Sequence, residues 1–248
     1  MALVRSWCVP PLLLLACAGA ARPQSKPGPR QAIGAALEAA RGSGALERRL
    51  LRTRWFQAGE GAAAVLYEVA GELAEGGKVV VCEVRITRAG GSTIERCELD
   101  FTGELRRFKS VERAGEATTT WEGELAEGKL AFQGTKEAVK WGDDVVPLHL
   151  AAFLLPCLAD QGLPAGLKLR VYEGPKEHKV AKAAELKLAA ERVELAGKSG
   201  WAAQLREGTI VELGLGGQKL VAIDALRARS TGQALERAAP PAPGGKKE

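Results

Sequence analysis

The sequence predicts a mainly β fold. We expect a curved antiparallel sheet or half-open β-barrel, with an N-terminal helix and an apolar central helical insertion packed on the concave face. Two observations lead to this fold class. Apolar and polar residues alternate over much of the chain after Thr53, as in antiparallel strands with one buried face. The alternation breaks once, over residues 143–164, where a run of apolar residues indicates a buried helix.

Residues 1–20 predict a secretory signal peptide. Arg5 precedes about ten apolar residues, whereas a membrane-spanning helix needs roughly 20. Two cleavage sites remain open. Ala18-Gly19-Ala20 fits release by signal peptidase, whereas Leu14-Leu15-Ala16-Cys17 resembles a lipobox, in which Cys17 is acylated. We therefore expect an exported protein of the periplasm or cell envelope, either released or anchored in the membrane through Cys17.

The remaining chain divides by composition. Residues 21–30 are rich in Pro and Gly and predict a flexible linker. Residues 31–232 are long enough for one hydrophobic core and predict a single β-rich domain, and residues 233–248 predict a disordered tail. The chain contains no Asn and much Ala, Gly, Leu and Arg, which indicates the coding bias of a high-GC bacterium. Its charges alternate in sign and its aromatic residues are few, so nucleic acid is not an expected partner.

Periodicity places the elements. Ile33, Ala36, Leu37 and Ala40 recur at helical spacing, so a helix is expected from residue 31 until Gly42-Ser43-Gly44 interrupts it. Period-two alternation then predicts strands, and glycine-containing turns separate them as in hairpins. The expected strands lie near residues 65–69, 80–86, 97–101, 168–172, 180–188, 191–196, 201–206, 209–213 and 219–224.

The insertion reads as a helix buried on all sides. Asp143 and Asp144 are expected to cap its start, with Pro147 in the first turn. Pro156 should end or kink it. His149 is the only polar residue between Val145 and Leu158, and we interpret it as a hydrogen-bonded core histidine.

Cys82 and Cys97 are expected opposite each other on neighbouring strands. A four-residue loop at 88–91 would place them in a non-hydrogen-bonded pair, where a disulfide can form. A two-residue loop, Ala89-Gly90, gives the same opposition with the wider spacing. We predict a Cys82–Cys97 disulfide, with two reduced, buried thiols as the alternative.

The sequence holds no complete catalytic or cofactor motif. The stretch at 195–200 lacks the first glycine of a phosphate loop, and no nucleophile elbow or zinc-ligand spacing occurs. We therefore expect a non-enzymatic protein with no cofactor and no metal.

The order of elements carries a resemblance. A leading helix (31–51), antiparallel hairpins and the insertion "VVPLHLAAFLLPCLADQGLPAG" resemble the half-open barrel of the bacterial lipoprotein-carrier and lipoprotein-binding superfamily, and related exported proteins of uncharacterised function. In that family the insertion plugs the concave face and acyl chains bind beneath it. The resemblance implies a ligand-binding cavity lined by Leu148, Phe153, Leu154 and Leu158.

Two functional hypotheses follow. The first is non-enzymatic binding of a lipid or another apolar ligand in a cavity between the insertion and the sheet. The alternative is a structural or protein-interaction module of the envelope, with a fully packed core and no ligand. A cavity beside the insertion is the feature that discriminates between them.

Overall fold

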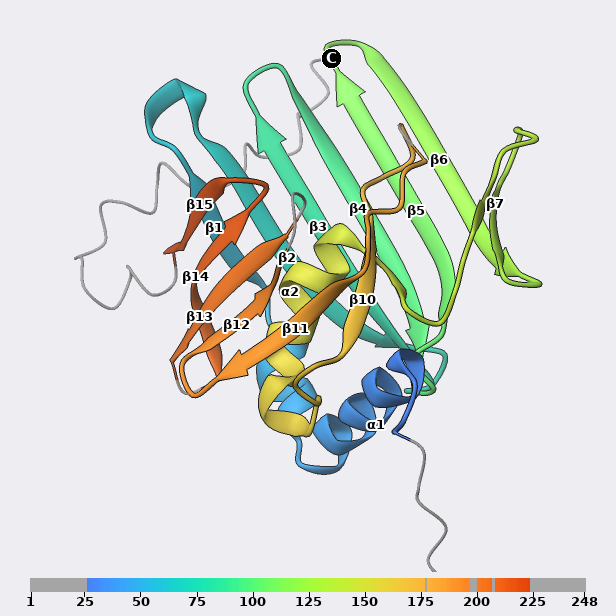
Figure 1. Ribbon diagram of the computed structural model, residues 1–248. Coiled ribbons are helices and arrows are strands. Elements are labelled where there is room, and N and C mark those ends of the chain that lie inside the picture. The colour runs from blue at the N-terminus through green and yellow to red at the C-terminus, as the bar shows by residue number, and fades with distance from the viewer. Residues whose placement is uncertain (1–25, 177, 197–199, 207, 224–248) are drawn as a thin grey trace, which may run out of the picture.

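The computed structural model describes residues 26–176, 178–196, 200–206 and 208–223. The predicted signal peptide (1–20), Cys17 and the predicted tail (233–248) lie outside the described residues. Within them the chain is mainly β, and 15 strands form one mixed, strongly curved sheet that is not closed into a barrel (Figure 1). This confirms the predicted fold class.

The sheet has a large wing of long strands. Each of its five central strands has ten residues, and each pairs antiparallel with its neighbour in sequence. Two short strands continue it to one edge of the sheet. The strands of the large wing are β2 (Val65–Ala74), β3 (Val79–Arg88), β4 (Gly91–Asp100), β5 (Leu105–Ala114), β6 (Ala117–Ala126), β7 (Lys129–Phe132) and β8 (Ala138–Lys140).

A small wing of shorter strands folds back over the concave face, and β1 joins the two wings through β2 and β15 (Figure 1). Its last pair, β9 with β10, is parallel. In spatial order its strands are β1 (Arg54–Ala58), β15 (Gln218–Ala222), β14 (Thr209–Leu215), β13 (Trp201–Arg206), β12 (Arg192–Leu195), β11 (Ala184–Ala189), β10 (Lys168–Tyr172) and β9 (Val145–Pro147).

Helix α2 (Leu148–Leu158) lies between the two wings, as the sequence predicted. Its residues from Leu150 to Leu158 are all buried, because strands of both wings and helix α1 pack around it. Pro156 neither ends nor breaks the helix, which runs on to Leu158 and a 3₁₀ turn at Ala159–Gln161.

The start of the insertion differs from the prediction. Val145–Pro147 forms β9, so Pro147 precedes the helix, and Asp144 does not cap it. Arg170 of β10 instead donates from Nε and Nη2 to the two oxygens of Asp144, both at 2.7 Å. These bonds hold the pKa of Asp144 below its usual value. A bidentate bond with a guanidinium group stabilises a carboxylate more than bonds with backbone amides at the start of a helix. Asp144 therefore pairs with Arg170 and does not cap α2.

Helix α1 (Pro29–Gly42) closes the lower end of the molecule, and a short π-helical segment (Leu46–Leu50) follows it. Gly34 lets α1 approach the turn between β4 and β5. A Cβ atom there would lie 2.5 Å from the Thr102 carbonyl carbon. α1 starts at Pro29, two residues inside the predicted linker 21–30.

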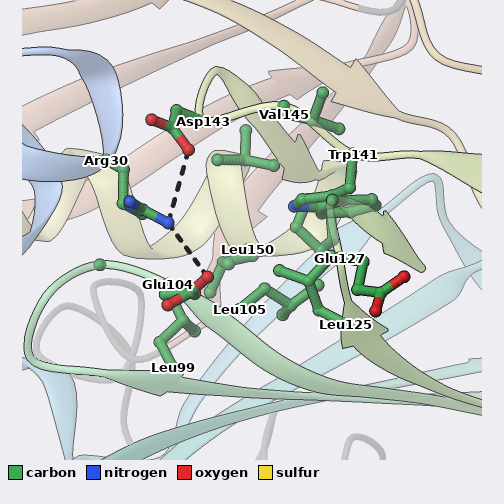
Figure 2. A pocket seen from close by; sticks show the side chains of 15 residues that line it. Arg30, Leu99, Glu104, Leu105, Leu125, Glu127, Trp141, Asp143, Val145 and Leu150 are labelled. Carbon is green, nitrogen blue, oxygen red and sulfur yellow. Dashed lines mark hydrogen bonds and ion pairs between the residues drawn. The ribbon is translucent and has the colours of Figure 1, made fainter.

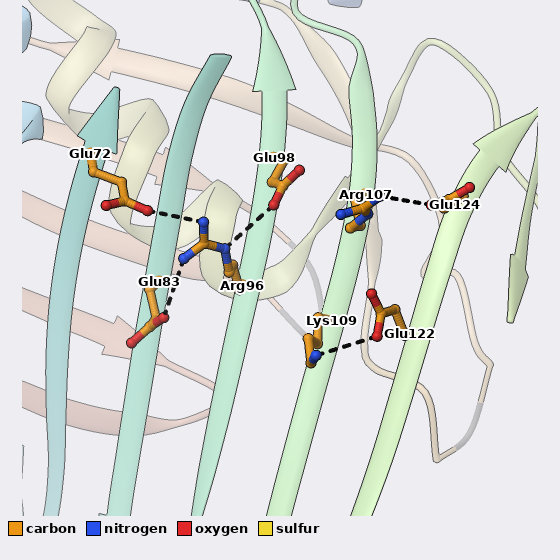
Figure 3. A network of polar contacts seen from close by, with 8 residues as sticks. All are labelled: Glu72, Glu83, Arg96, Glu98, Arg107, Lys109, Glu122 and Glu124. Atoms are coloured by element: carbon orange, nitrogen blue, oxygen red, sulfur yellow. Dashed lines mark hydrogen bonds and ion pairs between the residues drawn. The ribbon is translucent and has the colours of Figure 1, made fainter. Parts of the chain in front are cut away.

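The convex face of the large wing carries ion pairs between neighbouring strands (Figure 3). Arg96 of β4 pairs with Glu72 of β2 at 2.9 Å and with Glu98 at 3.4 Å, and it reaches Glu83 of β3 at 3.9 Å. Further along, Arg107–Glu124 and Lys109–Glu122 join β5 to β6. The convex face is therefore the solvated side of the sheet, and the apolar residues between these charges point to the concave side.

Candidate ligand-binding site

Two cavities lie on the concave face of the large wing, one above the other along the strands. The residues of β4 show the order. Thr93 and Glu95 line the cavity nearer the hairpin tips, Leu99 lines the cavity nearer α1, and Cys97 lies between them. We call the cavity nearer the hairpin tips the upper cavity, the cavity nearer α1 the lower cavity, and the packed zone between them the seam.

The lower cavity has a volume of about 290 Å³, and its lining combines apolar side chains with Arg30, Glu104, Glu127 and Asp143 (Figure 2). Its apolar side chains come from β4, β5, β6, the segment before β9, β9 and α2. They include Leu99, Leu105, Leu125, Trp141, Val145 and Leu150. At its mouth Arg30 of α1 pairs with Glu104 at 3.0 Å and with Asp143 at 3.5 Å. These three charged groups stand across the opening and satisfy one another.

The upper cavity has a volume of about 370 Å³ and a mixed lining. Val65, Ile86 and Trp121 supply apolar walls from β2, β3 and β6, and residues 173–176 pass beside them. Two of its carboxylates are bonded to lysines, while Arg88 donates to Thr93. Lys176 donates to Glu112 of β5 at 2.7 Å. Lys179 donates to the lining residue Glu173 at 2.8 Å.

A buried polar pair lies in the upper cavity. His149, in the first turn of α2, donates from Nδ1 to Glu95 of β4. Their side chains are only 13% and 11% exposed. The rings of Tyr67 and Phe153 lie 6.3 and 6.5 Å from the His149 ring. The predicted role of His149 as a hydrogen-bonded core histidine is confirmed.

The hydroxyl groups of Tyr67 and Ser110 also line this cavity, whereas Tyr172 does not line it and packs against Phe108 and Trp141. Ser110 is the register partner of Glu95, and both face the cavity. The Tyr172 hydroxyl is fully buried and lacks a partner. Burial, with a further contribution from the Glu95 charge, raises the pKa of Tyr172, and burial raises that of Tyr67 against an opposing effect of Arg88. Both phenols therefore stay protonated and able to donate.

The seam is a packed zone of aromatic side chains. Tyr172 of β10 lies 5.6 Å from both Phe108 and Trp141, and Phe108 meets Phe132 edge-on at 6.4 Å. Gly123 of β6 makes room for this packing, since a Cβ atom there would lie 3.1 Å from the Phe132 ring. The seam separates the two cavities.

The four residues implied by the resemblance line neither cavity. Phe153, Leu154 and Leu158 are buried in the core around α2, and Leu148 is half-buried at its first turn. His149 and Leu150 are the α2 residues that reach the cavities.

Cys82 and Cys97 lie opposite each other, as predicted, but both are free thiols. The predicted disulfide is absent. The pairing of Arg88 with Gly91 shows that Ala89 and Gly90 form a two-residue turn. Counting from that turn places Cys82 and Cys97 in a hydrogen-bonded pair, where the side chains lie farther apart than in the non-hydrogen-bonded pair of the longer loop.

Sequence reasoning missed the polar lining of the upper cavity, although a signal was present. Alternation places Glu95 on the same face as Cys97, and Ser110 on the same face as Phe108. A carboxylate on the inner face of a strand needs a buried partner, and His149 was the available one.

Among residues 26–223, wherever the structure describes them, no group of His, Cys, Asp and Glu side chains is arranged to hold a metal ion. In the same part of the chain, none of the helices has the length and apolar character needed to cross a membrane.

Comparison with known proteins does not assign this chain to a family. No family model and no curated protein matches this chain. A crystal structure of a DUF1089 family protein from Pseudomonas aeruginosa is 14% identical, with a TM-score of 0.34. The match covers 66% of this chain and 90% of that one. A likeness of this size assigns neither a fold nor a function.

Proposed function

We propose that this chain is an exported protein of the bacterial cell envelope that binds a lipid-like amphiphile in the upper cavity, without converting it chemically. The observation that carries the proposal is the lining of that cavity. Apolar walls at Val65, Ile86 and Trp121 stand beside the polar pair Glu95–His149. A volume of about 370 Å³ falls in the range of small-molecule sites.

Apolar walls can supply much of the affinity. Each methylene group removed from water contributes about 0.8 kcal/mol, so a few methylenes against Trp121 and Ile86 would offset the cost of holding the ligand. The lower cavity is the more apolar of the two, but Arg30, Glu104 and Asp143 pair across its mouth. A ligand would have to separate these groups to enter.

The polar groups support binding rather than catalysis. A serine nucleophile needs a base that removes its proton. Here His149 is engaged with Glu95, and no hydrogen bond between His149 and Ser110 occurs among the described residues.

The binding proposal is tested on the mature chain purified without detergent. Native mass spectrometry should show an adduct of lipid mass that organic extraction removes. The extracted chain should then bind the apolar fluorophore N-phenyl-1-naphthylamine at one saturable site. A chain that carries no adduct and binds no fluorophore would refute the proposal and leave the structural alternative.

Export and anchoring are tested separately. Intact-mass measurement and cell fractionation should give a mature chain that begins either near Ala21 or at an acylated Cys17. A cytoplasmic chain that retains residues 1–20 would end this part of the proposal and leave the cavity argument untouched.

A further inference from the structure

We infer that the lower cavity is a second binding site, which takes a small alkylammonium ligand: a protonated amine with a short apolar chain. The inference goes beyond the proposed function, which concerns the upper cavity. It comes from the charges at the mouth of the lower cavity and from the apolar walls behind them.

The walls of the lower cavity suit a short apolar chain. They consist of the indole ring of Trp141 and four leucine side chains, Leu99, Leu105, Leu125 and Leu150. Methylene groups that leave water for such walls favour binding. A volume of about 290 Å³ lies at the small end of the range of ligand sites, so the chain should be short.

The lining of this cavity carries an excess of negative charge. Among the described residues that line it, Arg30 is the only cation, and the carboxylates are Glu104, Glu127 and Asp143. Figure 2 shows Arg30 between the carboxylates of Glu104 and Asp143. No ion pair joins Glu127 to another described residue. The lining therefore holds three negative charges against one positive charge.

A cation is the kind of headgroup that can take the place of Arg30. A ligand that enters must part Arg30 from Glu104 and Asp143, which it meets at 3.0 and 3.5 Å. An ammonium group restores both contacts, because it is a positively charged hydrogen-bond donor like the guanidinium. A neutral group leaves the two carboxylates without a partner. An anionic group can pair with Arg30 only beside three carboxylates that repel it.

The exchange of Arg30 for a ligand should cost little. The side chains of Arg30, Glu104 and Asp143 are all more than a third exposed, so their ion pairs contribute little to stability. The displaced guanidinium can return to water on its flexible stem. Because the same water weakens the contacts of the ligand, the preference for a cation over an anion should be about tenfold and not larger.

The test uses the indole groups of the two cavities as separate reporters. Trp121 lines the upper cavity and Trp141 the lower one, so their indole signals in proton–nitrogen NMR spectra follow each site. Hexylammonium, hexanol and hexanoate share a six-carbon chain and differ in charge at pH 7.5. We expect hexylammonium to shift the Trp141 signal saturably, with an affinity about threefold above that of hexanol and about tenfold above that of hexanoate.

Arg30→Gln gives the sharpest outcome, because it removes the group that competes with the ligand. The affinity for hexylammonium should rise about threefold, whereas Glu104→Gln should lower it about threefold. Neither change should alter the affinity for hexanol by more than about twofold. Arg106→Gln is the matched control, since Arg106 forms an ion pair of similar exposure with Glu75 and does not line the cavity. Leu125→Phe fills the cavity and should weaken all three ligands.

Three outcomes would overturn the inference. A Trp141 signal that moves with none of the ligands would show that the lower cavity is no site. Equal affinities for hexylammonium and hexanoate would show that the mouth does not select a cation. An Arg30→Gln chain that binds hexylammonium no more tightly would show that Arg30 does not occupy the place of the ligand. All three leave the proposed function untouched, because binding of the fluorophore in the upper cavity is measured separately. Circular dichroism shows whether each variant has kept the fold.

Discussion

The upper and lower cavities share three strands, β4, β5 and β6, yet a shift of four residues along β4 changes their chemistry. At Glu95 the inner face of the strand is charged, and at Leu99 it is apolar. β5 follows the same order, with Ser110 above and Leu105 below. The upper cavity thus has a buried polar pair and apolar walls, and the lower cavity has apolar walls and a charged mouth.

The two cavities differ in how strongly water screens their charged pairs. At the lower mouth the side chains of Arg30, Glu104 and Asp143 are 37%, 43% and 65% exposed, so water screens their attraction. In the upper cavity Glu95 and His149 have little access to water. Breaking the buried pair should therefore cost more stability than breaking the pairing at the lower mouth, which is a surface contact.

The largest expected effect comes from breaking the buried pair. Glu95→Ala leaves His149 buried without its partner and should lower the free energy of unfolding by about 3 kcal/mol in urea denaturation. Glu104→Ala, at the lower mouth, should lower it by less than about 1 kcal/mol. Replacing both members of the pair, Glu95→Leu with His149→Leu, should recover most of the loss. Equal losses for Glu95→Ala and Glu104→Ala would show that the two cavities do not differ in this way.

Blocking the upper cavity should abolish most ligand binding. Thr93→Trp places an indole among the lining residues of β4 and should weaken binding of the fluorophore by at least about tenfold, because the ring occupies the volume of the ligand. Thr120→Trp puts the same ring on the opposite face of β6 as a control. Unchanged binding by Thr93→Trp would place the ligand elsewhere.

The seam between the cavities should make the protein sensitive to alkali. Burial raises the pKa of Cys82 to about 12 and that of Cys97 well above its usual value. Unfolded thiols titrate near pH 8.5–9, so the unfolded chain loses these protons first. Stability should be fully present below about pH 9 and fall as the pH rises toward 12, by about 1.4 kcal/mol per pH unit for each thiol.

Urea denaturation in reducing buffer between pH 8 and 10.5 measures this decline. Cys82→Ala should reduce the slope, and the buried tyrosines Tyr67 and Tyr172 account for a further decline above pH 10. Stability that is unchanged across this range would show that water reaches the thiols.

The smallest effect is expected from filling the lower cavity. Leu125→Phe adds volume to its lining, and the affinity for the fluorophore should stay within about twofold of the original chain. The free energy of unfolding should change by less than about 1 kcal/mol, since the cavity has room for the ring. A loss of binding comparable to that of Thr93→Trp would move the apolar part of the ligand into the lower cavity.

Local pattern was sufficient to predict β2, β3 and β4 of the large wing and the buried helix, whereas β5 to β8 were not among the predicted strands. The alternation of apolar and polar residues predicted that Val80, Cys82, Val84 and Ile86 share one face of their strand. The turn at 88–91 predicted that Cys82 lies opposite Cys97. The disulfide failed because the choice between two loop lengths decides which pairs are hydrogen-bonded, and the sequence left both open.

Contacts between residues that lie far apart in the sequence could not be predicted. Asp144 looked like a helix cap, but β10 brings Arg170 to it from 26 residues away. A bulge between Glu98 and Leu99 shifts the pairing of β4 with β5, so that Leu99 meets Leu105. The pairing of Glu95 with His149 spans 54 residues. Such contacts are set by the curvature of the sheet, which strand periodicity alone does not give.

An open sheet leaves two unpaired edges, and the short strands described above limit the risk this carries. β8 and β9 have three residues each, so neither offers a long row of free amide and carbonyl groups to a neighbouring molecule. Pro147 removes a donor from β9, and Lys140 adds a charge to β8. Growth of the sheet from one molecule into the next, the route to fibrous aggregates, is therefore blocked at both ends.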